Sequence, residues 1–190
     1  MAKIDIFNEF ILTGVLQDSE LDQLIIETLE KHYLENKQRV LTNRGGFQTT
    51  NITNEIISKK LLNKTINILL ENFNFVKNFT LNLTDIWINK NNSNDYNAPH
   101  NHPSSDLSGV YYTKTFPGQG GELIFYRDNS KLIDNSKLKN ILKHSETHTE
   151  FTLEPKNHTI FIFPSYLTHS VNPSKTDNRI STAFNIDIET

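Results

Sequence analysis

The feature that most constrains the fold is a change in the spacing of apolar residues near residue 76. Before it, apolar residues recur about every three or four positions, which predicts amphipathic helices. After it, apolar and polar residues alternate in short runs separated by Pro, Gly and Asn, which predicts β-strands. Helices followed by strands are typical of an α+β domain. We therefore expect a single domain over residues 1–190, with helical support at 1–76 and a β core at 77–190.

Two helices are expected in the first part of the chain and seven strands in the second. The helices cover Asp18 to Asn36, with Leu21, Leu24, Ile25, Leu29 and Tyr33 on one stripe, and Asn54 to Glu71, with Ile56, Ile57, Leu61, Ile66 and Leu70 inward. The strands are expected at about Phe79–Asn89, Leu107–Thr115, Gly121–Tyr126, His148–Leu153, Thr159–Phe163, Leu167–Val171 and Arg179–Ile188. Ser136 to His144 is expected to form a short helix or a structured loop. These elements predict a sandwich or barrel with the N-terminal helices packed on one sheet.

The first of these strands carries polar residues on a face that should be apolar. Strict alternation from Phe79 places one set of side chains together: Leu81, Leu83, Asp85, Trp87 and Asn89. Asp85 and Asn89 interrupt that face. We expect Trp87 to be a core residue and not a surface for substrate.

Composition excludes several kinds of site. The chain has no cysteine, which rules out disulfides, zinc–thiolate sites, iron–sulfur clusters and thiol nucleophiles, so any metal must be held by nitrogen and oxygen. The formal net charge is −3 and no Lys/Arg run stands out, so a general nucleic-acid-binding surface is not indicated. No apolar run approaches membrane-spanning length. We expect a cytoplasmic protein, in the cytoplasm of the host cell if the protein is viral.

Three histidines are candidate metal ligands. His100 and His102 are two positions apart, and residues with this spacing point to the same side of an extended chain. His169 follows an apolar strand and the turn at Pro164-Ser165, so it lies at the start of a strand and not in the middle of a core. Imidazole is a frequent ligand of iron, zinc, copper and nickel. The sequence therefore predicts a metal site at His100, His102 and His169.

The last predicted strand carries a candidate site for an anion. Its alternation places Arg179, Ser181, Ala183 and Asn185 on one face and Ile180, Thr182, Phe184 and Ile186 on the other. A guanidinium group binds a carboxylate through two parallel hydrogen bonds, and a neighbouring hydroxyl can add a third. The pair Arg179 and Ser181 is thus suited to a carboxylate ligand.

These motifs, in this order, resemble those of the 2-oxoglutarate and Fe(II)-dependent oxygenases. The segments are "HNHPSSDLSGVYY", "GGEL", "IFIFPSYLTHSVNP" and "NRIS", and the resemblance is greatest to a small group from phages and bacteria with prolyl-hydroxylase-like features. It extends roughly from Trp87 to Asp187. The resemblance implies a double-stranded β-helix of the jelly-roll or cupin-like type, with Fe(II) in its mouth.

The resemblance also implies roles for individual residues. His169 would be the distal histidine ligand, and Arg179, ten residues later, would bind the far carboxylate of 2-oxoglutarate with help from Ser181. Tyr112 matches a position from which prolyl-hydroxylase-like members hydrogen-bond this cosubstrate. The implied activity is a dioxygenase that uses O2, hydroxylates an unidentified substrate and releases succinate and CO2. A protein side chain is the first hypothesis for that substrate.

The second metal ligand departs from the usual pattern of the family. Where most members have His-x-Asp or His-x-Glu, this chain has His100-Asn101-His102. In one interpretation His102 replaces the carboxylate and three histidines hold the iron. In another, His102 is the first ligand and Ser104 takes the place of the acid, which leaves an open coordination position. In a third, Asp106 bends back to supply the acid.

Two other functions are compatible with the same sequence. One is a cupin-like metalloprotein without oxygenase activity, which would keep the histidines but have no use for Arg179. The other is a catalytically inactive binding module on the same fold.

Overall fold

The computed structural model describes residues 9–52, 54–76, 78–128 and 149–190, and the expected element at Ser136 to His144 lies outside them. Two helices are described, α1 (Ser19–Leu34) and α2 (Glu55–Asn72). The strands are β1 (Leu12–Val15), β2 (Asn43–Arg44), β3 (Phe47–Gln48), β4 (Thr80–Asn91), β5 (Tyr96–His100), β6 (Leu107–Lys114), β7 (Leu123–Tyr126), β8 (Glu150–Leu153), β9 (Thr159–Pro164), β10 (His169–Val171) and β11 (Arg179–Glu189). All predicted helices and strands within the described residues are present. The short strands β1, β2, β3 and β5 were not among the predicted elements.

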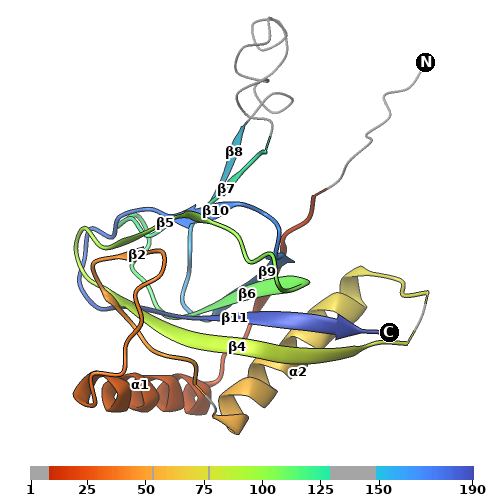
Figure 1. Ribbon diagram of the computed structural model, residues 1–190, viewed down its shortest axis with the longest axis horizontal. Coiled ribbons are helices and arrows are strands. Elements are labelled where there is room, and N and C mark those ends of the chain that lie inside the picture. The colour runs from red at the N-terminus through yellow and green to blue at the C-terminus, as the bar shows by residue number, and fades with distance from the viewer. Residues whose placement is uncertain (1–8, 53, 77, 129–148) are drawn as a thin grey trace, which may run out of the picture.

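The strands form two sheets that face each other. The larger has the order β1-β9-β6-β11-β4-β3 and the smaller the order β2-β5-β10-β7-β8, and neighbouring strands are antiparallel. From β4 to β7, and again from β8 to β11, successive strands alternate between the two sheets, as in a double-stranded β-helix (Figure 1). The prediction of an α+β fold of this type is confirmed.

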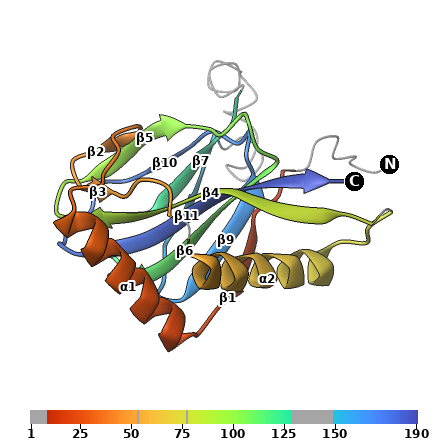
Figure 2. The same ribbon diagram turned by 60° about the horizontal axis from the view of Figure 1, so that its bottom comes forward.

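Both helices cover the outer face of the larger sheet (Figure 2). Each begins after a capping residue: the Asp18 side chain accepts a hydrogen bond from the Leu21 amide, and the Asn54 side chain accepts from the Ile56 and Ile57 amides. Apolar residues of both helices join the outward-facing residues of β4, β6, β9 and β11 in one core cluster. This core supports the larger sheet from behind and leaves its inner face free to line a site.

The buried face of α2 differs from the predicted one. Ile56 is 49% exposed and Leu70 is 57% exposed, so neither faces the sheet as predicted. The buried residues of this helix are Ile57, Leu61, Thr65, Ile68 and Leu69. This set follows one helical stripe, and the small Thr65 on it donates its hydroxyl to the Leu61 carbonyl. The sequence pattern missed it because a polar residue interrupts the stripe.

A β-bulge changes which face of β4 each residue takes. Asp85 pairs with Asn185, but the next pair is Leu83 with Ile186, so Thr84 is an extra residue on β4. A shift of one residue exchanges the two faces of a strand. Leu81 and Leu83 therefore pack toward the helices, whereas the following odd-numbered residues, Asp85, Trp87 and Asn89, face the interior between the sheets. The prediction that all five share one apolar face was wrong.

The side chains of the two consecutive tyrosines of β6 point to opposite faces of the larger sheet. Both are fully buried. Tyr111 points to the helices and donates its hydroxyl to Asp22 of α1 over 2.8 Å. Tyr112 points into the interior between the sheets. Alternation along a strand thus gives one tyrosine to the helix interface and the other to the cavity.

Candidate metal centre and cosubstrate cavity

The three predicted histidines lie at one end of two neighbouring inner strands of the smaller sheet, β5 and β10. His100 ends β5 and His169 begins β10, and the two residues are directly paired across these strands. His102 lies just beyond β5, where its backbone amide donates to the Ser165 carbonyl over 2.8 Å. Ser165 is fully buried in the turn after β9, so this turn fixes the loop that carries His102. Sequence reasoning had not identified this role of Ser165.

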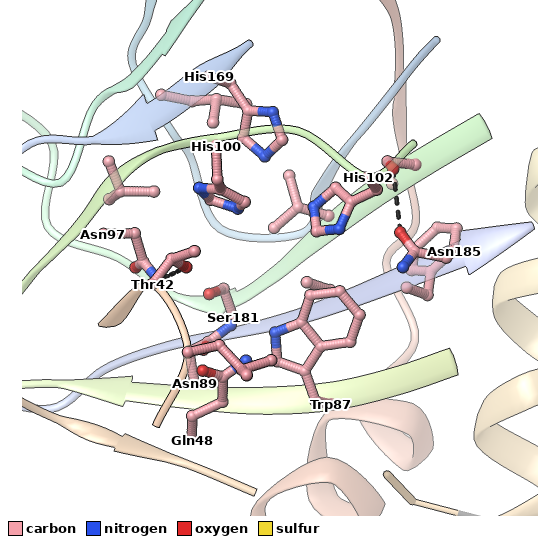
Figure 3. A pocket seen from close by; sticks show the side chains of 18 of the residues that line it. Thr42, Gln48, Trp87, Asn89, Asn97, His100, His102, His169, Ser181 and Asn185 are labelled. Carbon is pink, nitrogen blue, oxygen red and sulfur yellow. Dashed lines mark hydrogen bonds between the residues drawn. The ribbon is translucent and has the colours of Figure 1, made fainter. Parts of the chain in front are cut away.

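The three imidazoles form one compact cluster. Their ligand atoms all lie within 4.8 Å of one another. The ring centroids are 5.0 Å apart for His100 and His102, 4.3 Å for His100 and His169, and 5.3 Å for His102 and His169. Figure 3 shows the three rings together on one side of the cavity. The predicted site residues are therefore brought together by the fold.

Two of the histidines have one ring nitrogen fixed by the backbone. Nδ1 of His100 lies 2.7 Å from the Ala98 carbonyl, and Nδ1 of His169 lies 2.9 Å from the Leu167 carbonyl. A carbonyl can only accept, so Nδ1 carries the proton and Nε2 keeps its lone pair. Metal-binding histidines characteristically have this arrangement.

The cluster favours neutral imidazoles. Burial lowers the pKa of His169 to about 3, and the neighbouring His100 adds to the shift. Burial also lowers the pKa of His102 to about 4 and lowers the pKa of His100. Protons therefore do not compete for the lone pairs near neutral pH. A set of three neutral nitrogen donors fits a divalent transition metal such as Fe(II).

Arg179 lies in the same cavity and is 3% exposed. Its two terminal nitrogens donate to the Asn91 side chain over 3.2 Å and to the Gly121 carbonyl over 3.1 Å. Its Nε is buried with no hydrogen-bond partner, and within the described residues no carboxylate pairs with it. Burial of an uncompensated cation is costly, so the guanidinium is prepared for an anionic ligand.

The Gly120-Gly121 turn gives Arg179 its space. A Cβ on Gly121 would lie 2.5 Å from Arg179 Nε, and the φ of Gly121 is +77°. A side chain at this position would therefore both strain the backbone and displace the guanidinium group. The "GGEL" motif is explained by this contact.

Other buried polar groups of the cavity also lack partners. Ser181 pairs with Tyr112 of β6 on one side and with Asn89 of β4 on the other, which forms a row across the larger sheet. Gln48 of β3 extends the row beside Asn89. The Tyr112 hydroxyl, Gln48 Oε1 and Asn89 Oδ1 are all buried without a hydrogen-bond partner. Burial raises the pKa of Tyr112 to about 12, so its hydroxyl keeps its proton.

These unpaired groups test whether the cavity fits 2-oxoglutarate. The cavity is about 200 Å³ in volume and combines the histidine cluster with a buried arginine and unpaired amides and hydroxyls. Buried polar groups are normally paired, and the unpaired Arg179 Nε and Tyr112 hydroxyl are donors, so they indicate a ligand with acceptor oxygens. The residues present fit a dicarboxylate.

Among the cavity residues that were not predicted as part of the site are Gln48, Arg39 and Trp87. Gln48 belongs to a strand of two residues, which carries no recognisable pattern. Arg39 precedes it in an irregular segment. Trp87 is 6% exposed, so it is buried as predicted, but it lines the cavity and belongs to neither core cluster. Only the bulge in β4 reveals its orientation.

The residues proposed as alternative second ligands lie apart from the cluster. Ser104 is exposed in the turn after His102. Asp106 is also exposed, and its carboxylate accepts a hydrogen bond from the Ile188 amide over 2.7 Å. This hydrogen bond holds the Asp106 carboxylate at the end of β11, away from the histidine cluster.

Fold and site together define a class of protein: a double-stranded β-helix whose interior holds a histidine cluster and a buried arginine. The family model described as "Putative 2OG-Fe(II) oxygenase" matches residues 85–185, more than half of the chain. The chain belongs to the 2OG-Fe(II) oxygenase family. It is therefore a 2-oxoglutarate-dependent dioxygenase, with Fe(II) as its metal and O2 as a co-substrate.

Solved structures show the same fold at low sequence identity. The viral collagen prolyl hydroxylase vCPH from Paramecium bursaria Chlorella virus-1 is 16% identical, with a TM-score of 0.61 and coverage of 94% of this chain and 96% of that one. A prolyl-4-hydroxylase from Pseudomonas putida is 14% identical, with a TM-score of 0.61 and coverage of 94% and 93%. HygX from Streptomyces hygroscopicus, solved with nickel and 2-oxoglutarate, is 12% identical, with a TM-score of 0.60 and coverage of 94% and 82%.

None of the curated protein sequences matches the chain significantly. Neither helix of the described residues combines the length and hydropathy needed to cross a bilayer.

Proposed function

We propose that this enzyme is a hydroxylase in which His100, His102 and His169 hold the Fe(II). The compact cluster of three neutral imidazoles is the observation that carries this proposal. Ser104 and Asp106 lie outside the cluster, which favours His102 in the place of the usual carboxylate. All protein ligands would then be neutral, so none of them would offset the positive charge that the metal offers to the anionic cosubstrate.

Arg179, Tyr112 and Ser181 bind the distal carboxylate of 2-oxoglutarate in this proposal. Arg179 has only two of its five N–H groups engaged by the protein, so three remain for the ligand. The protonated hydroxyl of Tyr112 is a further donor. The ring of this tyrosine lies beside the arginine, with its centroid 5.2 Å from the guanidinium carbon. Burial of the cavity excludes water from the ion pair between Arg179 and the distal carboxylate, and this strengthens their electrostatic attraction.

The reaction converts a substrate C–H, 2-oxoglutarate and O2 into a C–OH, succinate and CO2. Bound Fe(II) supplies the redox chemistry that couples decarboxylation to hydroxylation. The chain's own residues orient 2-oxoglutarate through Arg179 and exclude water with the apolar walls of Leu123, Val110 and Phe163. Orientation and exclusion of water are the contributions of the protein that this cavity supports.

A protein side chain is the substrate that we propose. Two of the structural neighbours are named as prolyl hydroxylases. Leu41, which lines the cavity, is also 61% exposed, and its neighbour in sequence, Val40, is 71% exposed. An exposed apolar rim is suited to contact with a polypeptide.

Fe(II) added without oxygen to the protein and 2-oxoglutarate should produce a weak visible metal-to-ligand charge-transfer band. The band requires both metal and cosubstrate at one site, and absorbance titration measures it. A cupin-like metalloprotein or an inactive binding module would give no band, and its absence in folded wild-type protein would refute the proposed function.

The proposed ligand set makes a separate prediction for His102→Asp. A carboxylate at this position recreates the usual His-x-Asp pattern, so the variant should bind Fe(II) and form succinate at least as fast as the wild type. His102→Asn is the matched control, because it has the same shape without the charge and should bind Fe(II) less well. Loss of iron from His102→Asp would instead indicate that position 102 needs an imidazole as the first ligand.

A further inference from the structure

The three histidines are not held in the same way. The rings of His100 and His169 each have Nδ1 close to a backbone carbonyl, at 2.7 Å and 2.9 Å. The ring of His102 makes no hydrogen bond to any described residue; only its backbone is fixed, with the amide donating to Ser165 and the carbonyl accepting from Ser105. Metal-ligating histidines almost always have their second ring nitrogen oriented by a partner. Something else must restrict the rotation of this ring.

Packing against Trp87 is the alternative restraint that the structure offers. The ring centroids of Trp87 and His102 are 5.7 Å apart with an interplanar angle of 48°, within the range of favourable aromatic pairs. The other rings near His102 are those of His100 and His169, which belong to the cluster itself. Figure 3 shows Trp87 below His102, on the floor of the cavity.

Trp87 is itself held in place from two sides. Its neighbour on β11 is Ala183, whose small side chain leaves space for the indole ring. The guanidinium carbon of Arg39 lies 4.7 Å from the centroid of the Trp87 ring, in a cation–π contact. Arg39 is fixed in turn by an ion pair with Asp85, two residues before Trp87, over 2.9 Å. The contacts therefore run from Asp85 through Arg39 and Trp87 to His102.

We propose that Trp87, braced by Arg39 and Asp85, is a positioning residue that orients His102 for metal binding in place of a hydrogen bond. This inference rests on the proposed function, in which His102 is a metal ligand. It goes further because it assigns a role to three cavity residues that neither ligate the metal nor bind 2-oxoglutarate in that proposal. The aromatic contact restricts the imidazole in the free protein, so less conformational entropy is lost when the metal binds.

His169 offers an internal control for this proposal. Its ring also contacts aromatic side chains, with centroid distances of 4.9 Å to Phe163 and 5.9 Å to Phe125. It nevertheless has the hydrogen bond to Leu167 that His102 lacks. Removal of an aromatic ring beside His169 should therefore matter less for the metal than removal of the ring beside His102.

The test is an anaerobic Fe(II) titration by calorimetry, without 2-oxoglutarate, so that contacts to the cosubstrate do not contribute. Trp87→Leu should weaken Fe(II) binding by roughly 10- to 100-fold, the range typical of lost outer partners of a metal ligand. Phe125→Leu should leave the dissociation constant close to that of the wild type. Trp87→Phe keeps an aromatic face and should restore most of the affinity. Thermal melts establish that each variant is folded.

The proposal is overturned if folded Trp87→Leu binds Fe(II) as tightly as the wild type, or if Phe125→Leu weakens binding equally. If Trp87→Leu does not fold, Arg39→Met decides, because it removes the brace and leaves the indole ring. It should then weaken Fe(II) binding several-fold, and an unchanged dissociation constant would overturn the proposal.

His102→Ala separates this inference from the proposed function. If the wild type binds no Fe(II), or His102→Ala binds it equally well, the proposed ligand set fails. If His102→Ala loses affinity and Trp87→Leu does not, the ligand set stands and only the positioning role is lost.

Discussion

Replacement of Arg179 by alanine should abolish most of the affinity for 2-oxoglutarate and leave Fe(II) binding nearly unchanged. Truncation of one member of a buried charge pair typically costs about 2–5 kcal/mol, which corresponds to a loss of roughly 30- to 5,000-fold in affinity. Arg179 is 3% exposed, so solvent cannot replace the lost donors. Titration of 2-oxoglutarate into the anaerobic Fe(II) protein measures the effect by calorimetry.

Two variants complete this experiment. Arg179→Lys keeps the charge but replaces a planar donor group with a single ammonium, so its affinity should lie between those of the wild type and Arg179→Ala. Arg127→Ala removes the same charge from an exposed position at the end of β7 and should bind 2-oxoglutarate like the wild type. Equal affinities for the wild type and Arg179→Ala would show that the cosubstrate is not held here.

Replacement of His169 by alanine should eliminate Fe(II) binding. The loss should exceed the roughly 10- to 100-fold typical of an outer partner, because a direct ligand disappears. His169 is only 5% exposed and contacts the Phe163 ring, so the variant should also be less stable. Fe(II) titration and a thermal melt on the same sample measure the two effects separately.

The matched controls are His169→Gln and His158→Ala. Glutamine fills more of the space of the imidazole, so it should restore stability and still bind little metal. His158 lies outside the cavity, with Nδ1 3.1 Å from the Asp22 carboxylate, so its loss affects packing on α1 and should leave Fe(II) affinity intact. Retention of stoichiometric iron by His169→Ala would remove this residue from the ligand set.

The cavity side of β11 was predictable because its sequence alternates without interruption at that end of the strand. Arg179, Ser181, Ala183 and Asn185 line the cavity, as the period of two indicated. The same rule failed on β4, since Thr84 forms a bulge that exchanges the faces. A bulge depends on how a strand pairs with its neighbour, and a single segment does not contain that information.

The positions of the histidines were predictable in part. The spacing of His100 and His102 places both at the end of one strand, and the turn before His169 places it at the start of another. That β5 and β10 are neighbours is a property of the sheet order. Local sequence can indicate candidate ligands, but contacts between residues some 70 positions apart arise only from the pairing of strands.

By itself, the sequence determined the succession of helices and strands, the absence of thiol chemistry, and the motifs that carry Arg179 and the three histidines. These properties depend on residue type and on spacing along the chain, both of which are local. Only the tertiary structure decided that Gly121 makes room for Arg179, that Asp106 is engaged by the Ile188 amide, and that Trp87 packs against His102. Each of these contacts joins separate segments of the chain, and each depends on which strands are neighbours and on how the two sheets face each other.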